Sequence, residues 1–319
     1  MAPKTTASLR VNGRDVRVSS LEKVLFPGTG FSKAEVITYY IRIGEYLLPH
    51  LRDRPLTLKL FPDGVEARAV YRHNAPSYTP GWIARTTMPR SKGAGEIHSI
   101  LANDLPTLVW LANAADIEMH PLLARAPKFD EPTMMVFDLD PGPPAGVLEC
   151  AEVALWLREI LLGLRLESFV KVSGSKGLHL LVPLNARVTY EQTQARARWV
   201  AELMERARPE KIVAEMAKAS RGGKVFIDYS QNARHKSTAA VYSLRARPEG
   251  PFVSMPLTWE SLKKLLKRGE PEAFRVRPDE AVKFAARAGD IFAPVVQLKQ
   301  KLPSGEPDPG TVLKAARFK

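Results

Sequence analysis

Short apolar runs along the chain predict the strands of a sheet. Runs of three to eight such residues are bounded by Pro, Gly, Asn or Ser, which is typical of strands closed by turns. They lie at 9–11, 16–18, 56–61, 134–140, 169–172, 178–183 and 225–229. The run 134–140 ends in two carboxylates, which are the most informative positions of the chain.

Longer segments have apolar residues spaced three and four apart, which predicts amphipathic helices. These segments lie at about 32–51, 105–115, 147–166, 190–206, 258–267 and 279–287. Strands and helices alternate without an internal repeat or a linker, so we expect a mixed α/β (α+β) fold. It should form a single unit over 1–298, followed by a basic, mobile tail at 299–319 that is rich in Pro, Gly and Lys. The stretch 62–96 predicts irregular structure, with a basic loop at 85–95.

Asp138 and Asp140 end the longest apolar run and precede a Pro-Gly turn signal. Side chains alternate along a strand, so both carboxylates should point to the same face. Adjacent carboxylates repel each other unless cations lie between them, and oxygen ligands suit Mg²⁺ or Mn²⁺ better than Zn²⁺. Two solvated turn carboxylates remain the alternative.

The segment 173–177 consists of small residues and one lysine between two predicted strands. Glycine lets a backbone approach a ligand, and Ser173, Lys176 and His179 add hydrogen-bond donors, which suits a phosphate chain. The spacing does not match the P-loop of nucleotidases. A tight hairpin with an exposed lysine and a structural histidine is the alternative.

Asp228 is a lone carboxylate in the apolar run 225–229, with basic residues on both sides of it in the sequence. A buried Asp is costly unless it is paired or bound to a metal. A solvated Asp at a strand end, paired with one of those cations, would also fit. Three carboxylates, a glycine-lined loop and many cations together indicate metal-assisted nucleotidyl transfer, in which two metals align the hydroxyl and the α-phosphate.

The segments 136–142, 173–179, 224–232 and 242–247 resemble the motifs of the archaeo-eukaryotic primase superfamily. They are most similar to the polymerase domain of bacterial DNA ligase D, which acts in non-homologous end joining, and the similarity runs from about residue 21 to 293. The resemblance implies a primase-like catalytic core with an N-terminal α/β extension packed on it.

By this resemblance Asp138, Asp140 and Asp228 are the catalytic carboxylates and hold two Mn²⁺ or Mg²⁺ ions. The implied nucleotide-binding residues are Ser173, Lys176, His179, Arg221, Arg245, Lys59 and His120. From the residues alone, Lys59 would be a strand lysine that reaches solvent and His120 a histidine at a helix end.

Lys23 and Lys33 match two lysines that bind a DNA 5′-phosphate in this family. Lys33 falls in the first turn of a predicted helix, and a helix N-terminus together with a lysine favours phosphate binding. Tyr71 falls where relatives carry aromatic residues that contact the template base. Many relatives have two adjacent aromatics there, whereas this chain has Val70 beside Tyr71.

The charge balance agrees with a nucleic-acid partner. The 319 residues include 47 Lys and Arg against 34 Asp and Glu, a formal net charge of +13, which favours polyanions. Cys150 is the one cysteine in the sequence, so no intramolecular disulfide can form. This is consistent with a protein of a reducing cytoplasm. We see no signal core, membrane-spanning run or basic amphipathic stretch for a membrane surface.

The sequence lacks the Lys-x-Asp-Gly motif of the ligase module that ligase D enzymes often carry, so we expect a free-standing polymerase that leaves sealing to a separate ligase. The expected activity is template-directed addition of NTPs or dNTPs to 3′-OH ends at gaps, overhangs and broken ends, with Ku as an expected partner. We expect a cytoplasmic, nucleoid-associated enzyme. The alternatives are a de novo primase of a replicon and a non-catalytic protein that bridges DNA ends.

Overall fold

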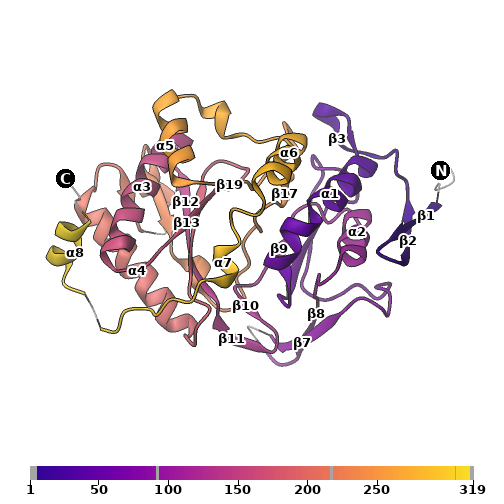
Figure 1. Cartoon of the computed structure of the whole chain (residues 1–319), viewed down its shortest axis with the longest axis horizontal. Helices are drawn as coiled ribbons and strands as arrows, with labels where there is room; N and C mark the ends of the chain where they lie inside the picture. The colour runs from indigo at the N-terminus through magenta and orange to yellow at the C-terminus, as the bar shows by residue number, and fades with distance from the viewer. Residues whose placement is uncertain (1–5, 91–92, 216–217, 306, 317–319) are drawn as a thin grey trace. The chain divides into compact units, whose positions relative to one another are not determined.

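The structure is a computed structural model that describes the chain except residues 1–5, 91–92, 216–217, 306 and 317–319 (Figure 1). The chain divides into two compact units, each built from separate stretches of sequence. Unit 1 comprises Met1–Pro127, Ser237–Ser254 and Val276–Asp290, and unit 2 comprises Lys128–Lys236, Met255–Arg275 and Ile291–Lys319. The single unit that the sequence suggests for 1–298 stays a prediction.

A six-stranded sheet forms the centre of unit 2. Its strand order is β15 (Ile212–Val213), β16 (Val225–Asp228), β12 (Met134–Pro141), β14 (Leu178–Pro183), β13 (Phe169–Val172) and β19 (Pro256–Leu257). The neighbours pair antiparallel, except β15 with β16, which are parallel. The longest strand, β12, therefore lies in the interior of the sheet, which explains why its sequence is a nearly continuous apolar run.

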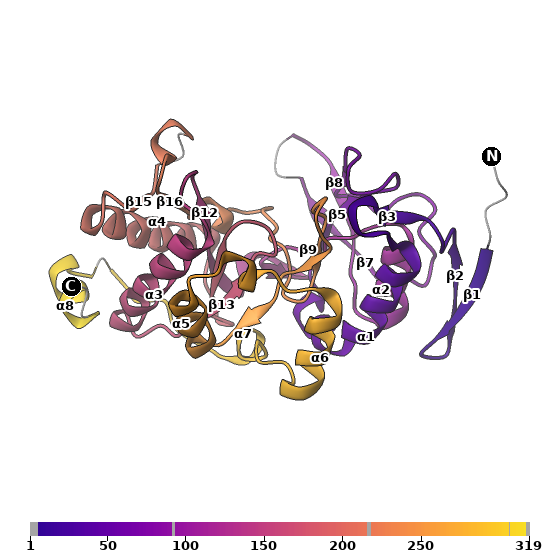
Figure 2. The ribbon, with the colours of Figure 1, turned by 90° about the horizontal axis from the view of Figure 1, so that it is seen from above.

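Helices pack on this sheet through the apolar stripes that the sequence predicts. Helix α3 (Val147–Gly163) contacts β12 and β14, and α4 (Tyr190–Ala207) contacts β12 and β15. Figure 2 shows α4 beside β15 and β16, and α5 (Trp259–Arg268) beside α3. Thr189 caps α4, because its side chain accepts from Gln192 N while the Gln192 side chain accepts from Thr189 N.

The remaining elements of unit 2 are short. They are β11 (Lys128–Pro132), α7 (Pro294–Gln297), α8 (Pro309–Ala315) and the 3₁₀ turns η2 (Lys218–Arg221), η3 (Ser230–Asn232) and η4 (Pro271–Phe274). Helix α8 lies within the stretch 299–319, where the sequence predicts a mobile tail, and it packs on α3 with Val312 buried. Residues 306 and 317–319 of that stretch lie outside the described residues.

Unit 1 is built around two packed helices, α1 (Lys33–Leu51) and α2 (Leu105–Asn113). Gly44 of α1 allows the close approach, because a Cβ there would lie 2.6 Å from a side-chain carbon of Leu105. Ser32 begins α1 through a capping box with Glu35, which agrees with the predicted helix start. Helix α6 (Pro278–Ala288) packs on α1.

Small sheets complete unit 1. A three-stranded sheet has the order β6 (Val70–Arg72), β5 (Leu56–Leu60) and β9 (His120–Pro121), and β1 (Thr6–Val11) forms a hairpin with β2 (Arg14–Ser19), which packs on α2. The other strands are β3 (Val24–Phe26), β4 (Phe31–Ser32), β7 (Arg85–Pro89), β8 (Glu96–Ile100), β10 (Ala124–Arg125), β17 (Leu244–Arg245) and β18 (Phe252–Val253), and η1 (Pro27–Thr29) is a 3₁₀ turn.

The prediction of irregular structure over 62–96 is wrong in part. Strand β6 pairs with β5, and most of the expected basic loop at 85–95 belongs to a hairpin in which β7 pairs with β8. The sequence misled because Pro and Gly break this region into very short strands. Ser91 and Lys92 lie outside the described residues.

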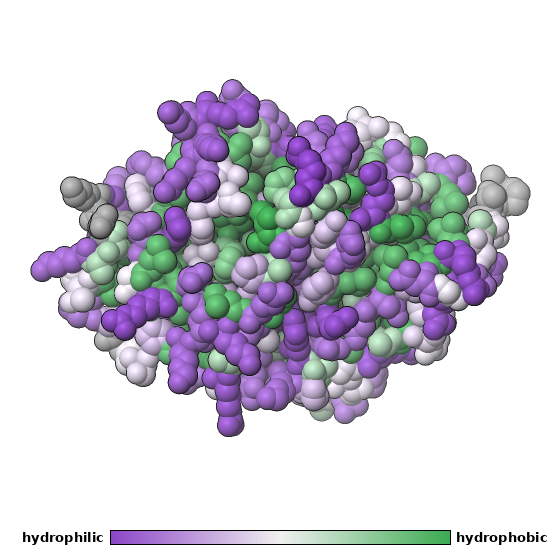
Figure 3. All heavy atoms as spheres, in the orientation of Figure 1, coloured by the Kyte–Doolittle hydropathy of each residue, from purple (hydrophilic) through white to green (hydrophobic). Residues whose placement is uncertain are grey.

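Hydrophilic residues cover most of the face drawn in Figure 3, as the excess of Lys and Arg leads one to expect. A search of the described residues for a helix long and apolar enough to cross a bilayer finds none.

Candidate active site

The three predicted catalytic carboxylates come from neighbouring strands of the unit 2 sheet. Asp138 of β12 pairs in register with Asp228 of β16, and Asp140 pairs with Phe226. Directly opposed residues of an antiparallel pair point to the same face, and so do residues two apart on one strand. The structure therefore brings Asp138, Asp140 and Asp228 to one face of the sheet, as the sequence predicts for the first two.

Polar side chains after β16 hold this edge of the site in place. Asp228 accepts hydrogen bonds from Ser230 N at 2.8 Å and from the Gln231 side chain at 3.2 Å, which fix the orientation of its carboxylate. Asn232 is buried, and its side-chain amide satisfies both the N–H and the C=O of Val136. It thus continues the hydrogen bonding of β12 beyond the last residue of β16.

A polar row crosses four strands on this face. Asp228, Asp138, His179 and Lys171 are successive register partners on β16, β12, β14 and β13. His179 Nε2 lies 3.3 Å from Asp138 Oδ1, and Lys171 Nζ lies 2.9 Å from His179 Nδ1. With Lys171 as an ammonium group, which only donates, Nδ1 accepts and the proton on Nε2 faces the carboxylate of Asp138. Lys171 thus selects the tautomer of His179.

The donor set on this face suits hard divalent cations. Carboxylate oxygens are the ligands that Mg²⁺ and Mn²⁺ prefer, and Asp138, Asp140 and Asp228 present them from one face of the sheet. Among the described residues, no group of three or more His, Cys, Asp or Glu side chains is arranged closely enough to hold a metal ion. The residue types fit two such ions, while the ligand set stays a prediction.

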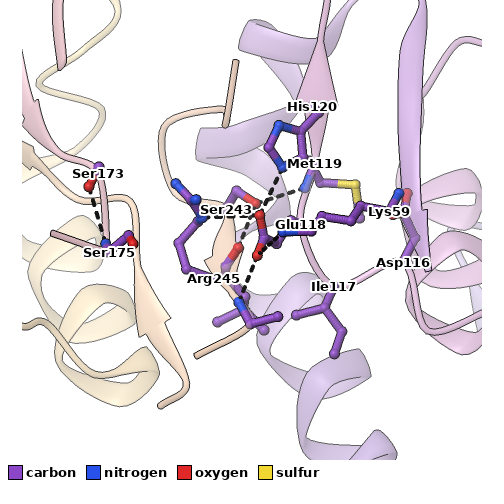
Figure 4. Close-up of polar contacts among 12 residues, drawn as sticks. Lys59, Asp116, Ile117, Glu118, Met119, His120, Ser173, Ser175, Ser243 and Arg245 are labelled. Atoms are coloured by element: carbon purple, nitrogen blue, oxygen red, sulfur yellow. Dashed lines mark hydrogen bonds and ion pairs between the residues drawn. The ribbon is translucent and has the colours of Figure 1, made fainter. Parts of the chain in front are cut away.

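The predicted phosphate loop lies against the carboxylate strand. A Cβ on Gly177 would lie 1.9 Å from the carbonyl oxygen of Leu139, between the two aspartates of β12, so only glycine permits this contact. Ser173 is buried, and its hydroxyl accepts from the backbone N–H of Ser175 at 3.2 Å (Figure 4). It also accepts from the backbone N–H of Gly177, at 3.2 Å. Lys176 is exposed at the tip of the loop. The loop is thus a rigid turn that carries one exposed lysine.

Arg221 belongs to a turn that is anchored at the end of β12. Gly142 N donates to Lys224 O and Gly223 N donates to Gly142 O, and a Cβ on Gly142 would collide with the carbonyl oxygen of Arg221. The Arg221 guanidinium lies 3.6 Å from the centre of the Phe226 ring. A predicted nucleotide-binding cation is therefore held next to the strand that carries Asp138 and Asp140.

The other predicted nucleotide-binding residues gather in unit 1 around a buried carboxylate, Glu118 (Figure 4). Its oxygens accept from Lys59 Nζ at 2.9 Å, His120 Nε2 at 2.8 Å and Arg245 Nε at 3.1 Å. A fourth hydrogen bond comes from the backbone of Ala246, at 3.0 Å. The three side chains come from β5, β9 and β17, so Glu118 joins three distant segments of the sequence.

The pKa values in this cluster depend on the balance of burial and charge. Burial raises the pKa of Glu118, but the hydrogen bond from His120 and the charges of Arg245, His120 and Lys59 outweigh it and hold the pKa well below its usual range. Burial lowers the pKa of His120, against the opposing hydrogen bond and charge of Glu118. Neighbouring Asp116 is fully buried, which raises its pKa to about 8 although Lys59 N donates to it.

Lys59 and Tyr71 face each other across the pairing of β5 with β6. They are register partners, and the Lys59 ammonium lies 5.8 Å from the centre of the Tyr71 ring and 5.3 Å from that of Phe61. Tyr71 is 62% exposed, so most of its ring is available to a ligand. His120 lies in strand β9 rather than at a helix end.

The two lysines predicted to bind a 5′-phosphate are neighbours in unit 1. Lys33 N donates to Lys23 O at 2.8 Å, and Lys33 is the first residue of α1. The side chain of Lys33 is buried and donates to Ser19 O, whereas Lys23 donates to Pro62 O and lies 3.5 Å from Asp63. Their ammonium groups are thus already engaged with carbonyl and carboxylate oxygens.

Several residues that hold these clusters together are not among the predicted site residues, Lys171 and Glu118 foremost. Lys171 is a lone charge in the apolar run 169–172, which was the available signal in the sequence, whereas Glu118 lies between Asp116 and His120 and gives no such signal. Their roles depend on register and on contacts between distant strands, which spacing along the chain does not reveal.

The fold and the polar face of its central sheet define the chain as a primase-like protein. It matches the family model of the LigD primase-polymerase domain over residues 32–292. The solved polymerase domain of Mycobacterium tuberculosis ligase D, in complex with DNA, superposes with a TM-score of 0.81 at 34% identity, covering 89% of this chain and 98% of that one. The chain belongs to the LigD primase-polymerase family, and the expected fold is confirmed.

Similar full-length proteins are much longer. The multifunctional non-homologous end joining protein LigD of Mycolicibacterium smegmatis is 38% identical over 282 residues, which cover 88% of this chain and 36% of that protein. The bifunctional LigD of Bacillus subtilis is 31% identical over 252 residues, 79% of this chain and 40% of that protein. The chain thus spans little more than a third of the length of these relatives.

Proposed function

We propose that this chain is a template-directed nucleotidyltransferase that extends 3′-OH ends of DNA with NTPs or dNTPs. The observation that carries the proposal is the common face of Asp138, Asp140 and Asp228 on adjacent strands, in a chain of the LigD primase-polymerase family. Its substrates would be gaps, overhangs and broken ends in non-homologous end joining, as the names of its relatives suggest.

Asp138, Asp140 and Asp228 would hold two Mn²⁺ or Mg²⁺ ions, which would activate the 3′-hydroxyl and neutralise the charge of the leaving pyrophosphate. Because Ser230 and Gln231 already fix the orientation of the Asp228 carboxylate, little conformational entropy of this side chain would be lost when a metal binds. His179 presents the proton on Nε2 as a donor toward anionic oxygens, in the tautomer that Lys171 selects.

Each unit contains residues that are candidates for nucleotide binding. Ser173, Lys176, His179 and Arg221 are candidates for the triphosphate in unit 2. In unit 1 the candidates are Lys59, His120 and Arg245, where Glu118 fixes three donors in one place. His120 is our candidate for sensing the ribose, and exposed Tyr71 for contact with the template base.

Lys23 and Lys33 would bind the 5′-phosphate on the far side of a DNA gap. A terminal phosphate carries more charge than a diester, so two adjacent lysines at a helix N-terminus can distinguish the two. Binding would require the ammonium of Lys23 to exchange its contact with Asp63 for the phosphate. The expected partners are a separate DNA ligase and Ku, and the expected location is the cytoplasm, at the nucleoid.

The test compares extension of gapped DNA with synthesis on unprimed templates, using NTPs or dNTPs with Mn²⁺ or Mg²⁺. We expect extension of the gapped substrate, stronger with a 5′-phosphate at the gap than with a 5′-OH. Synthesis on unprimed templates only would favour a de novo primase. DNA binding without any incorporation would indicate a non-catalytic bridging protein.

A further inference from the structure

Unit 1 contains a recess of about 520 Å³ that none of the roles above uses. Its lining residues come from the β1–β2 hairpin, from the loop before β7 and from α2, and they include Arg17, Ser19, Tyr78, Trp82, Trp110 and Asn113. This volume falls within the roughly 300–1,000 Å³ typical of small-molecule sites.

Three aromatic rings line the recess. Tyr78 is 63% exposed, although large aromatic side chains are usually well covered in folded proteins. Its ring centre lies 6.0 Å from that of Trp110, which is buried in α2 and anchors this wall. Trp82 forms the third aromatic surface, with the guanidinium of Arg14 stacked 4.6 Å from its centre. The recess thus offers flat apolar surfaces to a planar ligand.

The loop that carries Tyr78 and Trp82 is held in place by hydrogen bonds. Arg85 donates to the carbonyl oxygens of Thr79 and Pro80, and the Thr79 side chain donates to Pro76 O. On the opposite side, Asn113 of α2 accepts from Ser19 N and so fixes the end of β2. Since the walls are already ordered, a ligand would bind without a large loss of conformational entropy.

The charges beside the recess are mainly positive. The charged side chains of the β1–β2 hairpin are Arg10, Arg14, Asp15 and Arg17, and Asp15 pairs with Arg10 at 2.8 Å. Asp15 and Arg17 both line the recess, and the charge of Asp15 is balanced by its pair with Arg10, while the Arg14 guanidinium lies beside the Trp82 ring. Aromatic faces beside arginines are the combination by which proteins bind single-stranded nucleic acid, stacking on bases while cations follow the backbone.

We propose that this recess binds unpaired bases of a single DNA strand, which stack on Tyr78 and Trp82 while Arg14 and Arg17 contact the phosphates. Ser19 connects this site with the lysine pair, because its carbonyl oxygen accepts from Lys33 while its residue lines the recess. We infer single-stranded rather than duplex DNA because bases in a duplex are already stacked on each other and cannot stack on the aromatic rings. The proposal concerns binding alone and does not depend on catalysis.

The first experiment maps contacts by crosslinking in the presence of EDTA, so that incorporation plays no part. A 12-nucleotide oligo(dT) that carries 5-iododeoxyuridine is irradiated with the full chain, and the crosslinked peptides are identified by mass spectrometry. We expect crosslinks at Tyr78 or Trp82. Crosslinks that all map elsewhere, for example to Tyr71, would overturn the proposal.

The second experiment measures affinity for the same oligonucleotide by fluorescence anisotropy at fixed salt. Because base stacking on an aromatic side chain is sequence-tolerant and substantial, we expect Tyr78→Ala with Trp82→Ala to weaken binding about 10-fold or more. Arg14→Ala should weaken it too, whereas Arg158→Ala should not. Arg158 is the matched control, because it stacks on Trp259 at 4.9 Å and carries the same charge but lies in unit 2.

Affinity for a blunt duplex of the same length separates the proposed site from general charge effects. We expect the aromatic variants to leave duplex affinity unchanged, with a circular dichroism spectrum like that of the wild type. If the double variant does not fold, the single variant Tyr78→Ala decides, because that side chain is mostly exposed. Equal single-strand affinity for Tyr78→Ala and Arg158→Ala would contradict the proposal.

Discussion

Replacing Glu118 by glutamine tests whether one carboxylate organises the cluster of Lys59, His120 and Arg245 in unit 1. The variant keeps the size of the side chain, but it removes the charge and puts two N–H donors where four donors already converge. The Glu118 side chain is 2% exposed, so water cannot replace the lost acceptor. Lys59 and Arg245 would then face each other as cations without a common counter-charge.

The magnitude follows from burial. Removing one partner of a buried ion pair typically costs about 3–5 kcal/mol, because the remaining charge stays desolvated. Domains are stable by about 5–15 kcal/mol, so we expect a large fall of the urea midpoint with an unchanged m-value. Displacement of Lys59, His120 and Arg245 should also raise the KM for the nucleotide about 10- to 100-fold, with a smaller effect on kcat.

Glu249→Gln is the matched control, since Glu249 also lies in unit 1 and pairs with an arginine, but at 3.7 Å and with 44% of its side chain exposed. Exposed pairs contribute about 0–1 kcal/mol, so this variant should behave like the wild type. The reasoning is refuted if Glu118→Gln and Glu249→Gln have the same urea midpoint and the same KM.

Three further predictions follow from single contacts. Burial raises the pKa of Asp116 to about 8, so the folded state keeps a proton that the unfolded chain releases near 3.8. The free energy of unfolding should therefore fall by about 1.4 kcal/mol per pH unit as the pH rises between these two values. In urea titrations at several pH values, Asp116→Asn should remove this slope. Lys171→Met should reduce incorporation at least about 10-fold and lower stability by about 1–3 kcal/mol, because the buried Nδ1 of His179 loses the donor that selects its tautomer; an unchanged rate would exclude a role through His179. Gly177→Ala should impair both folding and incorporation, because its Cβ would meet a backbone oxygen, whereas Gly222→Ala, with open space around it, should not; equal urea midpoints and rates for the two would contradict the close approach.

Much of the fold could be predicted because the local sequence patterns of helix starts and apolar runs match the helices and strands that form. Ser32 and Glu35 form the capping box that begins α1, and the apolar run before Asp138 is an interior strand of the sheet. The two aspartates share a face because strand periodicity requires it, independently of the rest of the chain.

The remainder depends on contacts between distant segments. Lys171 and His179 meet only because β13 and β14 pair in one particular register, and Glu118 meets Arg245 across 127 positions of sequence. The β7–β8 hairpin was missed because its strands are short and contain Pro and charged residues, so packing rather than propensity determines it.

The most direct test of the central claim is single-nucleotide extension of a gapped substrate by wild type and Asp138→Asn, with DNA affinity measured in parallel. Asn keeps the shape of the side chain but weakens the proposed metal site, whereas DNA affinity arises from many dispersed cations. The account predicts a loss of extension rate on the order of 10³-fold or more with nearly unchanged DNA affinity. Extension at a rate close to wild type, with either Mg²⁺ or Mn²⁺, would contradict it.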